Sequence, residues 1–409
     1  MKNQFLQFSI FVCTSFVLTE AISADAPGAV AQVSLRQATD AAWQKAISAN
    51  EVAGMRLKAE AEKSIATNFW AAPPTLEFSQ RSDRWNKATG LRENELGIAW
   101  PVLLPGRRDA AVGAADAELS AVDAAEAAYR HRIAGEVREA AWLIAELRAG
   151  VALAEQQLGY MKRLAADVSR RVAAGDLARA DSLSAEAETL SAEVALLDAR
   201  QQLGAAISRW KLLTGLDQIP DPSEPLSDLA LSLASHPEAI FAAAADARSQ
   251  NRVLATKLAR LDAPELSLQI RDDFSGSGLP GQRSIGIGIR IPLGQSERGR
   301  TQFAAALSER NTAGAQLQLV RERLQLEAAV ASAALMSAEE KSVAERGRAK
   351  LLVERANLIE KSFNAGESSL QDLLRASATA ASARASHAKQ EVLTGLARAR
   401  LNQANGKAP

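Results

Sequence analysis

The sequence has little of three things that common functional classes require. It contains one cysteine, Cys13, so it can form neither a disulfide framework nor a thiolate metal site. Its 48 basic and 48 acidic residues balance, which argues against a nucleic-acid-binding protein, because such proteins carry a basic surplus. Aromatic residues make up only 4% of the chain, and with abundant alanine this composition is typical of long packed helices.

Patterns for catalysis and for metal binding are also missing. The three histidines, His131, His236 and His387, are far apart, and none has a carboxylate at metal-ligand spacing. His236 precedes Pro237 and is expected to start a helix, whereas the other two are expected to be solvated helix residues. We therefore predict no catalytic residues, no metal site and no cofactor, and hence a protein that is not an enzyme.

Long apolar runs are absent except at the N-terminus. Lys2 precedes an apolar stretch over 5–18, and residues 22–24 are small enough for cleavage. This pattern predicts a secretory signal peptide at 1–24, with a retained N-terminal anchor as the alternative. The residues before Cys13 are not those of a lipid-attachment site, so we expect no lipid anchor. Because no later segment is long enough for a membrane helix, a mature chain that spans a membrane would have to use β-strands.

The chain contains the same helical hairpin twice. One copy has a heptad seam that ends at Val172 and a Gly turn at 173–176, and the other has a seam that ends at Phe363 and a Gly turn at 364–367. Corresponding positions are 191 residues apart, which predicts a tandem repeat, with a chance match of two alanine-rich helices as the alternative. The matching pairs are Pro73 and Pro264, Pro101 and Pro292, Val172 and Phe363, Gly175 and Gly366, and Asp181 and Asp372.

Each repeat is predicted to contain a helix, two strands, a very long helix, the Gly turn and a returning helix. The first helix is expected over 33–67 as one element. The first returning helix has leucine every seven residues, at Leu183, Leu190 and Leu197. The predicted organisation is a signal peptide at 1–24, repeat 1 at 25–216 with strands 75–81 and 94–102, a linker at 217–230, repeat 2 at 231–404 with strands 265–271 and 284–293, and a tail at 405–409.

Polar and apolar residues alternate along the predicted strands, so one face is apolar and the other is polar or Gly. This alternation is typical of a transmembrane β-barrel, and the predicted fold class is therefore mainly α with a membrane β-barrel. Four strands cannot close a barrel, whereas three copies of the chain would supply twelve. Phe69, Trp70 and Trp100 suit an aromatic girdle at the membrane interface. The alternative is a soluble hairpin whose apolar face packs on helices.

The strand-to-helix junction resembles that of a known family. Residues 95–101 followed by 105–108 (Pro-Gly-Arg-Arg), the copy at 288–293 and 298–300, and the two Gly turns are similar to TolC-type outer-membrane efflux proteins. The resemblance implies a homotrimer in the outer membrane of a Gram-negative bacterium, with a twelve-stranded barrel and a twelve-helix periplasmic tunnel. It also implies a passive exit duct in a tripartite efflux system. The implied partners are outer-membrane lipid, a periplasmic adaptor (membrane fusion protein) and an inner-membrane pump, with residues 105–108 favouring the heavy-metal RND branch (CzcC-like).

The same resemblance places the periplasmic entrance at the Gly turns. Asp372 matches the first of two acidic residues that the family often carries after the second turn, but Arg375 stands at the second position. A ring of Asp372 side chains, or pairing of Asp372 with Arg375, would form a gate; the alternative is an ordinary exposed helix pair. The expected adaptor-docking tips are Ala174, Gly175, Asp176, Leu177, Ala365, Gly366, Glu367 and Ser368.

Two other functions fit parts of the sequence. A type I protein-secretion channel of the same fold is not separable from an efflux channel by sequence. A periplasmic coiled-coil adaptor would explain the helical hairpins, but it would not explain two strand pairs with an apolar face.

Overall fold

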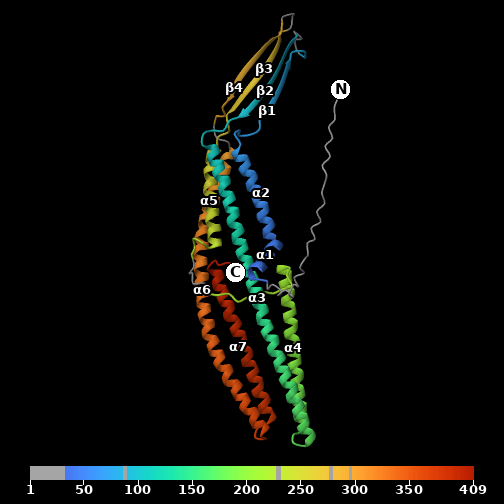
Figure 1. Ribbon diagram of the computed structural model, residues 1–409. Helices are drawn as coiled ribbons and strands as arrows, with labels where there is room; N and C mark the ends of the chain where they lie inside the picture. Colours follow the sequence, from blue (N-terminus) through green and yellow to red (C-terminus); the bar gives the residue numbers. More distant parts are fainter. Residues whose placement is uncertain (1–32, 86–89, 227–231, 276–279, 294–296) are drawn as a thin grey trace, which may run out of the picture.

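The chain is an elongated molecule in the computed structural model, with a β-sheet at one end and the turns of two helical hairpins at the other (Figure 1). The structure describes residues 33–85, 90–226, 232–275, 280–293 and 297–409. The predicted signal peptide at 1–24 lies outside these residues. No helix within them combines the length and the apolar character that crossing a membrane requires.

The described elements form two repeats of mainly helical structure with one small sheet, as the sequence predicts. The first repeat contains α1 (Leu35–Lys45), α2 (Ile47–Thr67), β1 (Thr75–Ser82), β2 (Leu91–Pro101), α3 (Arg107–Ala174) and α4 (Arg179–Thr214). The second contains α5 (Pro237–Leu258), β3 (Glu265–Ser275), β4 (Gln282–Arg290), α6 (Glu297–Asn364) and α7 (Leu370–Ala404). Strands β2 and β3 are longer than expected at the end of the sheet away from the helices. Their pairing continues there through charged residues, such as Glu93 and Asp273, which the apolar pattern does not mark.

The first helix is not a single element, which corrects the expectation for 33–67. Ala46 has an extended backbone, with φ −70° and ψ 139°, and separates α1 from α2. Lys45, just before the break, donates its ammonium to the carbonyl oxygens of Lys211 and Leu212 at the end of α4. A cation at this position favours the negative end of the helix dipole. Helix α1 packs on both α3 and α4, whereas α2 packs along α3, so tertiary contacts override the local helical pattern here.

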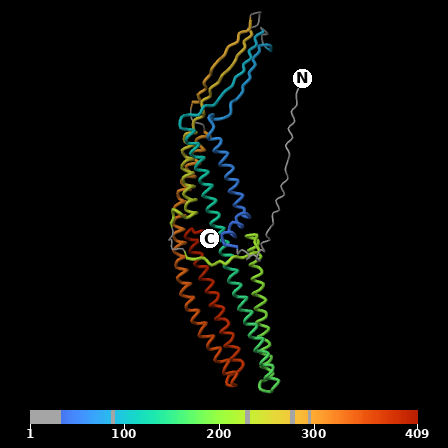
Figure 2. The backbone as a smooth tube through the Cα atoms, in the orientation of Figure 1, coloured from blue at the N-terminus to red at the C-terminus, as the bar shows by residue number. Residues whose placement is uncertain are grey.

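The two Gly turns have the same hydrogen bonds in both repeats. Gly175 has φ +89° and Gly366 has φ +80°, the left-handed conformation that glycine adopts without strain. Asp176 N–H donates to the carbonyl of Arg171, and Glu367 N–H donates to the carbonyl of Ser362, at 2.9 Å in both. This pattern satisfies carbonyls that a helix end would leave unpaired. Each turn follows a 68-residue helix, about 100 Å long, so both hairpins reach the same end of the molecule (Figure 2).

The sheet joins the two repeats through its central strands. Its order is β1-β2-β3-β4 with antiparallel neighbours, and β2 pairs with β3. On one face Phe78 and Ile287 are 69% and 77% exposed, and no described helix packs over them. The alternative of a hairpin covered by helices is therefore wrong. The apolar rows on this face are Trp100, Leu266 and Ile289; Leu76, Ile98, Leu268 and Ile287; and Phe78, Leu96, Ile270 and Ile285.

The helices pack mostly through alanine. Ala38, Ala128 and Ala383 are fully buried, and such small seam residues allow the helix backbones to approach closely. The leucines at seven-residue spacing on α4 behave differently. Leu183, Leu190 and Leu197 are 55–63% exposed, so their regular pattern does not form a seam within the protomer.

A buried ion pair connects the linker and the tail to α3 about midway along the molecule. Arg138 is 2% exposed and donates from Nε to Glu224, in the linker, at 2.8 Å. The same guanidinium also donates to Gln403 of α7 and to the carbonyl of Lys407 in the tail. Breaking such a pair by removing one partner leaves an uncompensated buried charge, so Arg138 is a strong constraint on how the repeats meet.

Two histidines lie next to this pair. His131 is buried, which corrects the expectation of a solvated residue, and its Nε2 lies 3.0 Å from the carbonyl oxygen of Gln403. His236 caps α5, as predicted, by accepting the Glu238 N–H, and its ring lies 5.2 Å from that of His131. Burial, followed by repulsion from His236, lowers the pKa of His131 to about 4. Burial also lowers the pKa of His236, against the attraction of Glu238.

The His131→Gln variant is expected to reduce the loss of stability in acid. The folded pKa is below the unfolded value of 6.5, so the neutral ring's contribution is complete above pH 6.5 and is lost as the pH falls toward 4. In the unsubstituted chain this amounts to about 2 kcal/mol of unfolding free energy between pH 7 and pH 5. Thermal unfolding of the variant and of the unsubstituted chain at pH 7 and pH 5 measures this difference in stability.

The control is His387→Gln on α7, where the histidine is partly exposed beside Glu391. This variant should keep the pH dependence of the unsubstituted chain. If both variants lose stability equally between pH 7 and pH 5, burial of a neutral His131 is not the cause.

Candidate functional site

The predicted interface aromatics gather where the sheet meets the helices. Phe69 and Trp70 pack edge to face with ring centroids 5.0 Å apart, and Trp70 lies 6.4 Å from Trp100. A bridge between Trp70 and Val102 fixes this cluster at the base of β2. Phe69 is 71% exposed, so nothing in the described protomer covers it. The cluster therefore borders the bare apolar face of the sheet on its helical side.

The predicted docking tips lie at the opposite end of the molecule (Figure 1). Six of the eight residues are exposed, and Leu177 and Ser368 are half-buried. A side chain added at Gly175 or Gly366 would meet no atom within 4 Å, so the surface around both turns is open. Beneath the tips, Val168, Phe363 and Leu373 belong to one apolar cluster that contains residues of both hairpins.

The predicted gate residues do not pair within the protomer. Asp372 is in the first turn of α7, where its N–H donates to Ser369 Oγ and its carboxylate accepts from the same hydroxyl at 2.7 Å. It therefore serves the helix start, where a negative charge is favourable. Arg375 is exposed, and no ion pair joins it to Asp372 in the described protomer. Pairing between copies stays a prediction.

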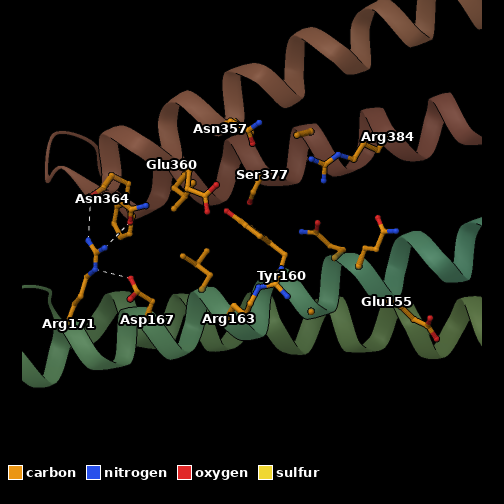
Figure 3. Close-up of a pocket in the computed structure, with 18 of the residues that line it drawn as sticks. Glu155, Tyr160, Arg163, Asp167, Arg171, Asn357, Glu360, Asn364, Ser377 and Arg384 are labelled. Atoms are coloured by element: carbon orange, nitrogen blue, oxygen red, sulfur yellow. Dashed lines mark hydrogen bonds and ion pairs between the residues drawn. The ribbon is translucent and has the colours of Figure 1, made fainter.

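An arginine that the sequence did not single out joins the two hairpins. Arg171, in the last turn of α3, donates to Asn364 Oδ1 of α6 at 2.8 Å and forms an ion pair with Asp167 at 2.9 Å (Figure 3). Its guanidinium also lies 4.9 Å from the centre of the Phe363 ring. The position of Arg171 just before a Gly turn was a possible signal, but its partner is on another helix and no spacing rule identifies it.

A polar cavity of about 1030 Å³ separates the hairpins next to this contact. Figure 3 shows Tyr160 and Arg163 on one hairpin facing Asn357, Glu360 and Ser377 on the other. Burial, and then the nearby carboxylate of Glu360, raises the pKa of Tyr160 to about 12. Near the tips the hairpins are thus joined by the apolar cluster of Val168, Phe363 and Leu373 and by a few polar contacts beside the cavity.

The described residues contain no group of three or more histidine, aspartate or glutamate side chains arranged to hold a metal ion. The candidate site consists of the predicted docking and gate residues around the two tips and of the predicted interface aromatics at the base of the sheet.

Comparison with known proteins gives one family and several similar structures. Residues 75–216 match the family model "Outer membrane efflux protein". A search of curated protein sequences finds no significant match. The fold is similar to VceC of Vibrio cholerae, at TM-score 0.73 and 18% identity over 91% of this chain and 96% of that one. It is also similar to the outer-membrane channels CmeC of Campylobacter jejuni and MtrE of Neisseria gonorrhoeae, both at TM-score 0.70 over 91% of this chain, with 14% and 16% identity over 85% and 89% of those chains.

The family model and the similar structures cover different lengths of the chain. Identities this low show a shared fold, and the family model supplies the family for the segment from β1 to the end of α4. Over the rest of the chain, the sheet, the long hairpins and the repeat agree with the fold of the similar structures. Residues 75–216 therefore match the outer membrane efflux protein family, and the chain as a whole shares the fold of the outer-membrane channels to which it is similar.

Proposed function

We propose that three copies of the chain form the outer-membrane exit channel of a tripartite efflux system. The channel is a passive duct that receives its cargo from an inner-membrane pump through a periplasmic adaptor. The observation that carries this proposal is the four-stranded sheet with one bare apolar face, which lies at the end of two hairpins about 100 Å long. The family and the similar channels support it.

The sheet supports closure by copies of the chain. Strands β1 and β4 are the edges of the described sheet, and each pairs on one side only. Unpaired backbone groups are costly in lipid, so membrane strands occur in closed barrels. If β1 of one copy pairs with β4 of the next, three copies place twelve strands in one barrel. The apolar rows would then face lipid, and the polar or Gly positions of the other face would line the lumen.

The helices support the same assembly. Helices α4 and α6 lie on opposite sides of the protomer (Figure 1). Both carry exposed leucines: Leu183, Leu190 and Leu197 on α4, and Leu319, Leu326, Leu351 and Leu358 on α6. Regular apolar positions that stay bare in a single chain are typical of helix–helix interfaces. We infer that α4 of one copy packs against α6 of the next.

Replacing Leu190 by Glu is expected to destabilise the trimer, because it places a charge in the proposed contact between copies. The unsubstituted chain, extracted in detergent, should be a trimer and should conduct ions in planar bilayers, whereas the variant should run mostly as monomer. Size-exclusion chromatography with light scattering measures the mass, and bilayer recordings measure the conductance.

Ala195→Glu is the matched control, because it adds the same charge to an exposed position about 140° around α4. It should leave the trimer intact. A monomeric unsubstituted chain, or a stable trimer of the Leu190→Glu variant, would contradict the proposed assembly.

We further propose that the entrance is held closed partly by the Arg171 contact between hairpins and partly by Asp372 and Arg375 of the three copies. Repulsion among three Asp372 carboxylates near the axis would be reduced by Arg375 of the same or a neighbouring copy. Within a copy, Arg171 holds α3 to the end of α6. Loss of either contact would free a hairpin to move outward.

Arg171→Ala is expected to raise the single-channel conductance, because it removes the hydrogen bond to Asn364 and the contact with Phe363. The Asp372→Ala and Arg375→Ala double variant should also raise the conductance if contacts between these residues of the three copies help to close the entrance. Arg170→Ala is the control, since Arg170 is 74% exposed and pairs with Asp167 of its own helix. Conductance equal to the control in both test variants would exclude these residues from the gate.

The exposed tips are the proposed docking surface for the adaptor. Gly175→Trp or Gly366→Trp should abolish efflux in a host that carries the complete system while the trimer remains intact. Gly175→Ala and Gly366→Ala are the controls, because they impose the same backbone strain at positive φ without the bulk. Normal efflux by both tryptophan variants would place docking elsewhere.

The heavy-metal RND branch is a narrower proposal, supported by residues 105–108. In the structure Arg107 and Arg108 of this junction donate to the carbonyls of Leu261 and Thr67, and so fix α3 to its neighbours. Growth of the same host in the presence of metal salts or drugs identifies the cargo. Tolerance to metal salts but not to drugs is the result expected for that branch.

A further inference from the structure

A shallow pocket with two arginines lies where α5 and α6 meet the sheet. Its volume is about 490 Å³, and it is lined by Arg260, Glu297, Arg300, Thr301 and Ala304. Arg260 follows the end of α5, and the other four residues belong to the first turns of α6. The pocket belongs neither to the entrance nor to the tips, which are at the other end of the molecule.

Arg260 is held in place but lacks a charged partner. Its guanidinium carbon lies 3.6 Å from the centre of the Phe303 ring, a cation–π contact that fixes the side chain. Its Nε is buried without a hydrogen-bond partner among the described residues, and no ion pair joins Arg260 to a described carboxylate. The second arginine, Arg300, pairs with Glu297 of its own helix at 2.9 Å. The side chains of Arg300 and Glu297 are 63% and 85% exposed, so a ligand can reach both.

The surroundings of the pocket are basic. Six basic residues lie around the ends of α5, α3 and α6, and we name this set the basic collar; three carboxylates, Asp109, Asp262 and Glu297, accompany it. The arginines at the start of α3 donate to backbone carbonyls, so those contacts leave their charges uncompensated. The basic collar consists of Arg107, Arg108, Lys257, Arg260, Arg298 and Arg300.

The pocket is at the depth of the interface aromatics. Pro264, four residues after Arg260, accepts a hydrogen bond from Val102 N–H at 2.7 Å. Val102 in turn bridges Trp70, which neighbours Trp100. Tryptophan side chains at the border of an apolar face mark the level of lipid headgroups. Headgroup phosphates therefore lie at the same height as the two arginines.

We propose that this pocket binds the phosphate of a phospholipid from the periplasmic leaflet of the outer membrane. Guanidinium groups match phosphate oxygens in geometry and charge, and the fixed Arg260 loses little side-chain freedom on binding. Glu297 suits the ammonium of an ethanolamine headgroup, so a zwitterionic phosphoethanolamine lipid satisfies all three charged residues. The site rests on the proposed outer-membrane location but not on conduction, so lipid retention and channel conductance test the two proposals separately.

The test measures lipid retained by the full-length protein. Protein extracted in mild detergent is incubated with defined phosphatidylethanolamine or phosphatidylglycerol and examined by native mass spectrometry, with inorganic phosphate as competitor. The unsubstituted chain should retain phosphatidylethanolamine at one site per copy. Arg300→Ala and Arg260→Gln should each bind about tenfold more weakly, the effect expected for loss of one charge-assisted hydrogen bond.

Arg310→Ala is the matched control, since it removes the same charge from an exposed position of α6 about 15 Å further along the helix. It should bind lipid as tightly as the unsubstituted chain. Equal retention by Arg300→Ala, or equal loss in Arg310→Ala, would overturn the site. Displacement by millimolar inorganic phosphate would show an anion site rather than a lipid site. Absence of lipid from an intact oligomer would mean that a neighbouring copy fills the pocket.

Discussion

The backbone of a strand in lipid must have all its N–H and C=O groups paired, and this constraint governs the rest of the molecule. One chain provides four strands and leaves two edges open. A single chain therefore cannot complete a membrane structure, however well its helices pack. The apolar face of the sheet, the leucines on the sides of the protomer and the proposed threefold assembly all follow from this one deficit. The alanine seams inside the protomer do not depend on it, because they are complete within one chain.

The tandem repeat meets a second geometric requirement. An entrance at the far end of a tunnel closes only if all the helical hairpins end at the same level. Helices α3 and α6 each have 68 residues, and each ends in a glycine turn with the same hydrogen bonds. Duplication of one unit gives equal lengths without separate adjustment of two sequences. The repeats also form one continuous sheet, because β2 of the first repeat pairs with β3 of the second.

Local and periodic features were predictable from the sequence. Period-two alternation indicated the strands, and glycine after a heptad seam indicated the turns, because both signals depend on neighbouring residues. Features that depend on distant partners were not predictable. The break at Ala46 follows from the packing of α1 on α4, and the burial of His131 follows from contact with the end of α7. The contact between Arg171 and Asn364 joins helices from different repeats.

The leucines of α4 show a different limit of sequence reading. Their seven-residue spacing predicts an apolar stripe on the returning helix, and this stripe is exposed within the protomer, so the pattern does not say whether a partner helix is in the same chain. Within the protomer many of the buried residues of the long helices are alanines, which allow close approach but bury little apolar area per residue. The larger residues are divided, since Ile144, Leu324 and Leu373 are buried within the protomer whereas Leu183, Leu190 and Leu197 are exposed. The exposed leucines are the apolar area that the proposed contact between copies would bury.

The strength of the contacts also changes along the molecule. At mid-length the buried Arg138–Glu224 pair joins the linker and the tail to α3, and an apolar cluster that contains Trp43, Ile144 and Trp210 joins α1, α3 and α4. Near the tips the hairpins meet through a smaller apolar cluster and the Arg171 contact, and a polar cavity lies beside these contacts. Hydrogen bonds to water replace polar contacts at low net cost, whereas separating an apolar seam exposes its whole area. A hairpin end is therefore easier to displace than its middle. Outward movement of the tips while the sheet end stays fixed is the motion that this gradient favours, and it suits the proposed entrance.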